Sequence, residues 1–217
     1  MALLLKTEKI PRAAIQRLAV YLQSLERMLR DGAALVSSEM LAQACDVNAS
    51  QIRKDLTYFG EFGVRGVGYN IHDLISSIKK SLSIDKPWNC ALAGVGNLGR
   101  ALLNYREFRQ RQYNIIAAFD CDPLKIGQRV GGLEILHTRQ LAEYIAEKKI
   151  QIGIISTPPE SAQTVADHMA EAGIKGIMNY ASAHIFTPDN IFVERVDFFN
   201  HLYALSFNIS QSEEKTV

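Results

Sequence analysis

Cysteine is scarce in this 217-residue chain, which has only Cys45, Cys90 and Cys121. The three are far apart, with no C-x-x-C pair and no metal-ligand spacing around them. A disulfide framework and a metal site are therefore not expected, and the default interpretation is buried, reduced thiols. A reactive Cys121 is the alternative that the sequence leaves open.

Long apolar stretches are also lacking. The longest runs, such as residues 152–155, fall far short of the ~20 residues that a membrane span needs. The first ten residues, MALLLKTEKI, are too short and too soon charged to serve as a signal peptide. We therefore expect a cytoplasmic protein that has no membrane partner.

Charge of either sign is nearly balanced, since 24 Lys and Arg face 23 Asp and Glu for a net charge of +1. The balance is uneven along the chain. The first 84 residues carry 11 basic against 8 acidic side chains, and the remainder carry 13 against 15. This excess is too mild to indicate nucleic-acid binding by itself. With 47% hydrophobic residues, the chain is long enough for one large domain or two modest ones.

Two hydrophobic periodicities divide the chain. Apolar residues recur at helical spacing up to Leu82, whereas short β-rich runs alternate with amphipathic helices from Trp88 onward. The polar segment 83–89 interrupts both patterns, so it is the predicted join. The predicted organisation is two domains, a C-terminal dimerisation helix and a disordered tail, at residues 1–84, 85–196, 197–210 and 211–217.

The first domain has the order of elements of a winged helix-turn-helix. Helices are predicted at residues 11–31, 38–45, 49–59 and 71–82, with Ser37 or Ser38, Asn48 and Asn70 as caps of the last three. Gln51 is expected to complete a capping box with Asn48. The turn 46–48 has the right length for the motif, and four glycines between residues 60 and 68 are typical of a hairpin wing. Three unrelated small helices are the alternative.

The helix at residues 49–59 is the predicted recognition helix, because such a helix places its N-terminal side chains at base edges. Arg53 and Lys54 would neutralise phosphates, and Gln51 would read adenine. Arg65, at the predicted hairpin tip, would enter a narrow A·T-rich minor groove. The predicted DNA contacts are Ser50, Gln51, Arg53, Lys54, Thr57, Tyr58 and Arg65. The alternative is a helix of ordinary exposed charges, partly cancelled by Asp55 and Glu61.

The second domain opens with a dinucleotide fingerprint, Gly94-Val95-Gly96-Asn97-Leu98-Gly99. It follows an apolar run and begins a helix, whose backbone N–H groups and dipole favour a pyrophosphate. The strand 114–120 then ends at Asp120, about 20 residues beyond Gly99. A carboxylate there accepts the adenosine ribose hydroxyls and repels a 2′-phosphate, which favours NAD over NADP. The alternative is that the glycines serve helix–strand packing alone.

Further strands at residues 133–137, 151–157 and 176–181 alternate with helices, which predicts an α/β fold with a doubly wound parallel sheet. Ligands of such sheets bind at the carboxyl ends of the strands. Thr157-Pro158 and Asn179-Tyr180 end two of them and are expected to face the nicotinamide, although the proline could merely start a helix. The five histidines form no catalytic constellation, and no substrate domain follows. We therefore expect no catalytic residues and no enzyme.

The two halves together resemble the Rex family of redox-sensing transcriptional repressors. The segments that carry the resemblance are IPRAAIQRLAVYLQSL, ASQIRKDLTYFGEFGVRGVGYN, GVGNLGRALLNY, FDCDPLKIG and VERVDFFNHLYALSF. The resemblance implies a homodimer that binds a double-stranded inverted-repeat operator. It further implies that NADH releases the operator, whereas NAD⁺ permits binding, and that the C-terminal helix is swapped into the partner subunit.

For such a swapped helix, we predict a switch at its start. Asp197 would pair with Arg17 of the partner subunit in the DNA-bound form and with Tyr105 of the partner subunit when NADH is bound. The alternative is that Arg17 and Asp197 are unconnected surface charges. Two other functions also remain open, a small NAD-dependent oxidoreductase and a CoA-binding or ligase-type subunit. The second is open because residues 156–182 also resemble CoA-binding Rossmann modules of acyl-CoA ligases.

Overall fold

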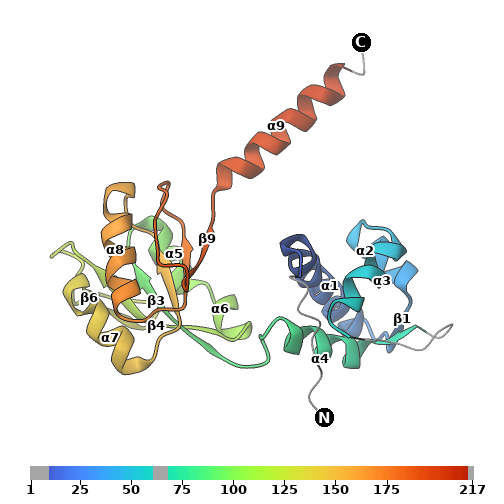
Figure 1. Ribbon diagram of the computed structural model, residues 1–217, viewed down its shortest axis with the longest axis horizontal. Helices are drawn as coiled ribbons and strands as arrows, with labels where there is room; N and C mark the ends of the chain where they lie inside the picture. Colours follow the sequence, from blue (N-terminus) through green and yellow to red (C-terminus); the bar gives the residue numbers. More distant parts are fainter. Residues whose placement is uncertain (1–9, 61–67, 215–217) are drawn as a thin grey trace. The chain divides into compact units, whose positions relative to one another are not determined.

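The computed structural model describes residues 10–60 and 68–214. The chain forms two compact units, Met1–Lys86 and Pro87–Val217, and each is described by itself (Figure 1). Arg65 and most of the predicted hairpin wing lie outside the described residues. Within the described ranges, every helix is too short or too polar to cross a membrane.

The first unit contains four helices among its described residues. They are α1 (Arg12–Arg30), α2 (Ser38–Cys45), α3 (Ala49–Thr57) and α4 (Ile71–Ser81). The strands β1 (Leu35–Val36) and β2 (Tyr69–Asn70) pair antiparallel at the base of the predicted wing. One buried cluster holds the helices together, with Leu18, Leu25, Leu41, Ile52 and Ile71 at its centre. The predicted helix-turn-helix, α2 and α3, is therefore packed on α1 and α4.

Short side chains cap the helices of this unit where the sequence places them. Ser37 caps α2, Asn48 caps α3 and Asn70 caps α4, each by accepting a backbone N–H three residues on. The predicted capping box at α3 is wrong in its second half. The Gln51 amide donates to the carboxylate of Asp55 at 2.7 Å, because a buried charged oxygen is a stronger acceptor.

The second unit is built on a seven-stranded sheet in the order β5-β6-β4-β3-β7-β8-β9. Its strands are β3 (Trp88–Ala93), β4 (Tyr113–Asp120), β5 (Arg129–Val130), β6 (Leu133–His137), β7 (Ile152–Ile155), β8 (Gly176–Asn179) and β9 (Phe192–Arg195). All neighbours are parallel except β5 and β6. The predicted doubly wound α/β sheet is confirmed, and the short edge strands β5 and β9 are additions to it.

Helices cover both faces of this sheet (Figure 1). They are α5 (Asn97–Asn104), α6 (Glu107–Gln110), α7 (Leu141–Lys148) and α8 (Pro159–Glu171), with a 3-10 turn η1 (Thr138–Gln140) before α7. Alternate residues of β3 point to opposite faces. Ala91 and Ala93 join the cluster that contains α7 and α8, whereas Cys90 and Leu92 join the one against α5 and α6. The sheet is therefore buried on both sides, as a parallel sheet requires.

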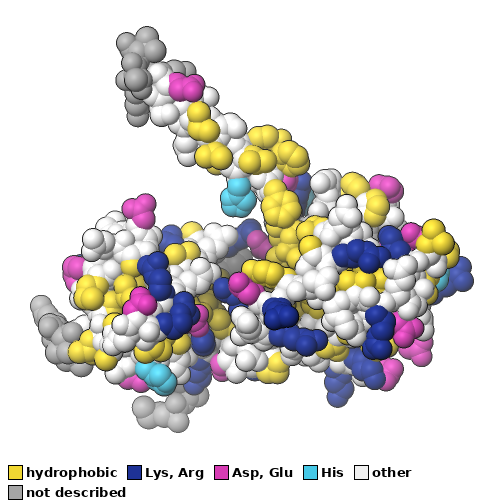
Figure 2. All heavy atoms as spheres, turned by 180° about the vertical axis from the view of Figure 1, so that it is seen from behind, with side chains coloured by type: hydrophobic (Ala, Val, Ile, Leu, Met, Phe, Trp, Pro, Cys, Tyr) yellow, Lys and Arg dark blue, Asp and Glu magenta, His cyan; other side chains and the backbone are white. Residues whose placement is uncertain are grey.

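The chain ends in the long helix α9 (Phe198–Glu214), whose described side chains are all exposed. Exposed hydrophobic side chains occur along it from Phe198 to Ile209 (Figure 2). The predicted disordered tail is wrong for residues 211–214, which continue the helix. Gln and Glu are good helix formers, and no glycine or proline interrupts them.

The three thiols are in different surroundings, and none is in a disulfide. Cys90 is buried in β3, which raises the pKa of its thiol to about 12. Cys45 is half-buried, and Cys121 is exposed directly after β4. The expectation of buried thiols is therefore wrong for Cys121, which follows the last strand residue into a surface turn.

Candidate functional site

The glycine fingerprint lies between β3 and α5, and its glycines have separate roles. Gly94 has a φ of +94°, and a Cβ there would come within 2.6 Å of the Ser156 carbonyl oxygen. A Cβ on Gly99 would collide with the Gly94 carbonyl. Gly96, in contrast, has open space around the position of a Cβ. Packing thus explains the first and third glycines, while the middle one leaves room for a ligand at the start of α5.

The rest of the fingerprint follows from this geometry. Val95 is fully buried and donates its backbone N–H to Asp120 at 2.8 Å. Asn97 and Leu98 form the first turn of α5 after Gly96, so the N–H groups of that turn have no acceptor within the helix. Asp120 therefore fixes the loop at Val95.

Asp120 ends β4 next to this loop and is only 6% exposed. Its Oδ2 accepts the Val95 N–H and the Lys125 ammonium at 3.0 Å, and its Oδ1 accepts the Asp122 N–H at 2.9 Å. Burial opposes the charge of this carboxyl, but these three donors hold the pKa of Asp120 below its ordinary value. It is therefore ionised at neutral pH, and it already accepts hydrogen bonds from other residues of this chain.

The segment after β7 contributes a polar atom that lacks a partner. The Thr157 hydroxyl oxygen is buried and has no hydrogen bond within the described residues. Its neighbour Ser156 donates to the Gly94 carbonyl at 2.7 Å, which ties this segment to the glycine loop. A buried hydroxyl without a partner is costly, so a ligand group or water is expected to complete it. Pro158, the next residue, is the N-cap of α8.

The segment after β8 is partly committed to its own turn. Asn179 is 1% exposed, and its amide donates to the Ala183 carbonyl and accepts the Ala181 N–H, each at 2.9 Å. Its side chain therefore shapes the loop. Tyr180 is half-buried, and its ring lies 6.4 Å from that of Phe198 at the start of α9. Of this predicted pair, Tyr180 offers the freer side chain to a ligand.

The predicted cofactor residues thus meet at one edge of the sheet, at the carboxyl ends of the adjacent strands β4, β3, β7 and β8. The open space at Gly96, the unpartnered Thr157 hydroxyl and the ionised Asp120 fit a dinucleotide.

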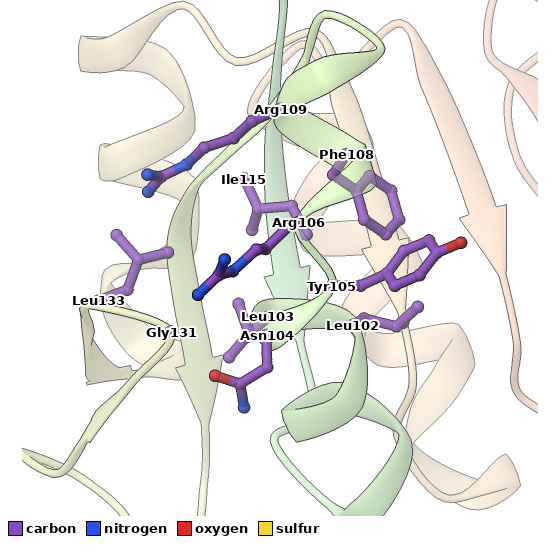
Figure 3. Close-up of a pocket in the computed structure, with 10 residues that line it drawn as sticks. All are labelled: Leu102, Leu103, Asn104, Tyr105, Arg106, Phe108, Arg109, Ile115, Gly131 and Leu133. Carbon is purple, nitrogen blue, oxygen red and sulfur yellow. The ribbon is translucent and has the colours of Figure 1, made fainter.

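A separate cavity of about 400 Å³ lies beside the C-terminal end of α5 (Figure 3). Leu102, Phe108 and Ile115 line it with apolar surface, and Arg106 and Arg109 add positive charge. Ile115 is five residues before the end of β4, about 16 Å along the strand at 3.3 Å per residue. The cavity is therefore distinct from the edge where the glycine loop lies.

The predicted recognition helix, α3, presents most of its predicted DNA contacts at the surface. Ser50, Arg53, Lys54 and Thr57 are exposed, and Tyr58 is half-buried. Arg53 donates to the hydroxyl of Ser38 at 2.8 Å and pairs with Glu39 at 3.2 Å, both at the start of α2. Ser50 donates to the capping Asn48, and Thr57 donates to the Lys54 carbonyl. Lys54 is therefore an exposed cation that this helix leaves to solvent.

Asp55 lies on the same helix and is fully buried, so its interpretation as an exposed, cancelling charge is wrong. It accepts two hydrogen bonds from Arg17 of α1, at 2.6 and 2.7 Å, and one from Tyr21 at 2.8 Å. Gln51, half-buried, donates to it as well. No sequence spacing marks this cluster, because Arg17 and Tyr21 lie 38 and 34 residues before Asp55.

The three predicted switch residues lie on different elements. Arg17 is on α1, bound to Asp55. Tyr105 follows α5, is 54% exposed and borders the cavity (Figure 3). Asp197 precedes α9, accepts from Arg195 at 3.1 Å and caps the helix by accepting the Phe199 N–H at 3.0 Å. Arg17 therefore belongs to the first unit, whereas Tyr105 and Asp197 belong to the second.

Fold and site together define a class of protein, a chain that joins a helix-turn-helix unit to a dinucleotide-type Rossmann unit. Two family models match these parts. One, described as a putative DNA-binding protein N-terminus, covers residues 9–57, and the other, described as a CoA binding domain, covers residues 85–183. Each matches less than half of the chain, so the relatives that span its whole length are more informative.

Full-length relatives share one description, redox-sensing transcriptional repressor Rex. The one from Maridesulfovibrio salexigens is 59% identical, over 96% of this chain and 100% of its own length. The one from Solidesulfovibrio magneticus is 54% identical, over 95% of this chain and 94% of its own. The chain therefore belongs to the Rex family of redox-sensing transcriptional repressors, which is not a family of enzymes.

Solved structures of similar proteins agree. A crystal structure of RSP in complex with β-NAD⁺ and operator DNA has a TM-score of 0.91 at 36% identity, with 97% of each chain covered. A crystal structure of RSP in complex with β-NADH has a TM-score of 0.88 at 34% identity, covering 97% of this chain and 99% of that one. RSP is described as a Rex-family repressor. These similarities favour the repressor over the oxidoreductase and the CoA-binding subunit.

Proposed function

We propose that this protein is a cytoplasmic repressor that binds an inverted-repeat operator as a homodimer and is released by NADH. The observation that carries the proposal is the joining of two sites in one chain. One is a capped recognition helix with exposed Lys54, and the other is a glycine loop with open space at Gly96. The two RSP complexes, one with operator DNA and one with β-NADH, support the same pairing of ligands.

On the cofactor side, the pyrophosphate lies over the loop from Gly94 to Gly99, where backbone N–H groups and the α5 dipole bind it. Thr157, Pro158, Asn179 and Tyr180 form the nicotinamide end, with the Thr157 hydroxyl as the available polar group and Asn179 shaping the loop. NAD⁺ carries a positive nicotinamide and NADH a neutral one. A closed, largely apolar pocket binds the neutral ring more tightly than the charged one, because burying an unpaired charge is costly.

At the adenosine end, Asp120 has one acceptor position left for a ribose hydroxyl. A carboxylate offers about four lone pairs, and three donors of this chain already occupy Asp120. Together with Asp122 and Lys125, the local charge is negative, which disfavours the 2′-phosphate of NADPH. NAD(H) is therefore the proposed cofactor.

On the DNA side, α3 enters the major groove with its N-terminal side chains toward the bases. Ser50 and Gln51 lie at that end, Arg53 and Lys54 neutralise phosphates, and Thr57 and Tyr58 border the backbone. Arg65 of the wing is proposed to enter the adjacent minor groove.

The homodimer is proposed from α9. Phe198, Leu202, Leu205 and Ile209 form one stripe, and Phe199, Tyr203 and Phe207 cover much of the rest, all at least 50% exposed. A helix with an apolar face this wide is normally buried against another surface. We propose that it is swapped into the partner subunit, where the apolar side of the cavity beside Tyr105 accepts its first turn.

The proposed switch lies at the start of that helix. Asp197 pairs with Arg17 of the partner subunit in the operator-bound form. When NADH binds, Asp197 pairs instead with the partner subunit's Tyr105. This closes the dimer, so that the spacing of its two recognition helices no longer matches the two operator half-sites. Full reversal between the two forms requires that NADH bind the closed form more tightly by about 5.5 kcal/mol.

Fluorescence anisotropy with a labelled AT-rich inverted repeat tests this function. We expect the protein alone or with NAD⁺ to bind, NADH to release the DNA, and NADPH to act only at much higher concentration. A protein that binds no such DNA, or whose binding ignores NADH, contradicts the proposal. Steady consumption of NADH with a carbonyl substrate would support the oxidoreductase instead.

A further inference from the structure

A buried ionic cluster joins the recognition helix to the first helix. Asp55 of α3 is 0% exposed, and its two oxygens accept four hydrogen bonds. Oδ2 accepts from Arg17 Nε at 2.6 Å and from the Tyr21 hydroxyl at 2.8 Å. Oδ1 accepts from Arg17 Nη2 at 2.7 Å and from Gln51 Nε2 at 2.7 Å. All four lone-pair positions of this carboxylate are therefore occupied by named donors.

Such a cluster specifies an orientation more than it adds stability. A buried ion pair contributes little net free energy over apolar packing, but losing one partner leaves a costly unpaired charge. The surrounding apolar side chains, such as Leu18, Ile52 and Leu56, pack without directional preference. The two parallel N–H···O bonds between Arg17 and Asp55, in contrast, fix both the angle and the distance between α1 and α3.

Arg17 keeps donors beyond those given to Asp55. A guanidinium has five N–H groups, and two of them donate to this carboxylate. The Arg17 side chain is 31% exposed, so it stays accessible from solvent while Asp55 holds it. A second carboxylate can therefore pair with Arg17 without displacing Asp55.

We propose that Asp55 is a positioning residue for operator recognition. It sets the orientation of α3 on α1, and it holds Arg17 so that an acidic group pairing with Arg17 acts directly on the recognition helix. This inference rests on the proposed function, in which that acidic group is Asp197 of the partner subunit. Asp55 itself needs no contact with DNA or NADH, and it acts through Arg17 and Gln51.

The substitution Asp55→Asn in the full-length protein tests this role at nearly constant shape. Each oxygen of Asp55 receives one Arg17 N–H, so either orientation of an Asn amide sets its NH₂ against an Arg17 donor. Tyr21→Phe is the milder variant, since it removes one donor and leaves the Arg17 pair intact. Asp31→Asn is the matched control, because it removes the same negative charge at the exposed C-terminal end of α1.

Operator affinity at several salt concentrations, NADH affinity and the NADH-driven change in operator affinity are measured for each variant. We expect Asp55→Asn to bind the operator at least about tenfold more weakly, which corresponds to about 1.4 kcal/mol. Its NADH affinity and the salt dependence of its operator binding should stay at wild-type values, because no phosphate contact is lost. The effect of NADH on the remaining operator binding should shrink, and Tyr21→Phe should show the same pattern to a smaller degree.

A double-mutant cycle with Arg17→Gln separates positioning from general destabilisation. If Asp55 acts through Arg17, Asp55→Asn costs little further operator affinity in the Arg17→Gln background. The inference would be overturned if the losses of operator affinity in the two single variants were additive, or if Asp55→Asn and Tyr21→Phe bound the operator as Asp31→Asn does. In either case, operator binding by the wild type would still support the proposed function. A wild-type protein without operator binding would overturn the proposed function first, and this inference with it.

Discussion

At the scale of single residues, two buried acids organise the two units. Asp55 fixes the recognition helix to α1, and Asp120 fixes the glycine loop to the end of β4. Position along the chain predicted Asp120, because the fingerprint sets the distance from Gly99 to the acid. No spacing signal marked Asp55, because a single acid in a helix with Arg and Lys neighbours looks like any exposed charge.

Asp120→Asn is expected to weaken NADH binding by about tenfold, because one charge-assisted hydrogen bond to ribose is lost and the anchor of the loop at Val95 weakens. The affinity for NADPH should fall less, because the variant repels the 2′-phosphate less strongly. The ratio of NADH affinity to NADPH affinity should therefore decrease. Calorimetric titration with both cofactors measures the ratio. Asp189→Asn, an exposed acid of the same unit, is the control. An unchanged NADH/NADPH ratio in Asp120→Asn would remove the ribose role.

The Asp55 cluster also predicts a dependence of stability on pH. Burial disfavours the charge of this carboxyl, yet its hydrogen bonds from Arg17 and Tyr21 hold the pKa of Asp55 below its ordinary value. A depressed folded-state pKa contributes stability above the unfolded value of about 3.9, and this is lost as pH falls through the folded value. Chemical unfolding should therefore show a gap between wild type and Asp55→Asn that is full near neutral pH and narrows below about pH 4. A gap that is constant from pH 7 to pH 3 would contradict the account.

At the scale of elements, local signals predicted most of the fold and distant contacts accounted for the rest. The caps of α2, α3 and α4 were predictable because each hydrogen bond joins residues three apart. The edge strands β5 and β9 were not, because two to four residues carry no periodicity. The end of α9 was placed too early, since the polar composition of residues 211–214 suits a helix and a tail equally.

The recognition helix is tested by removing its cations. We expect Lys54→Ala and Arg53→Ala to weaken operator binding while NADH affinity stays unchanged. A lost phosphate contact should lower the slope of log affinity against log salt by about 1. Lys80→Ala, on α4, serves as the control for a lost charge. Normal operator binding by both recognition-helix variants across salt concentrations would show that α3 does not contact the DNA.

The proposed dimer is tested on α9. Leu202→Glu places a charge in the middle of the apolar stripe, so we expect the dimer to dissociate about hundredfold more readily, with loss of tight operator binding. Asn208→Glu introduces the same charge on an exposed polar position of the same helix and should leave the dimer intact. Analytical ultracentrifugation over a range of concentrations measures both. A Leu202→Glu protein that remains dimeric would place the interface elsewhere.

At the scale of the whole molecule, NADH binding in one unit has to change DNA binding in the other. The proposed path runs from the cofactor edge through Tyr105 and Asp197 to Arg17, and from Arg17 through its observed hydrogen bonds with Asp55 to α3. The first and the last of these steps each lie within one unit, whereas the steps through Asp197 are proposed to join two subunits. The switch was therefore predictable only through the resemblance, which implied a swapped helix. The central claim depends on the proposed dimer.

The most direct test holds total NAD(H) constant, varies the NADH/NAD⁺ ratio, and follows operator occupancy by anisotropy for wild type and Asp197→Ala. The account predicts that wild-type occupancy falls as the NADH fraction rises. Asp197→Ala should still bind some NADH, measured by its fluorescence, but keep its operator occupancy nearly constant. Wild-type occupancy that does not respond to the ratio, or an Asp197→Ala protein that NADH releases as readily as wild type, would contradict it.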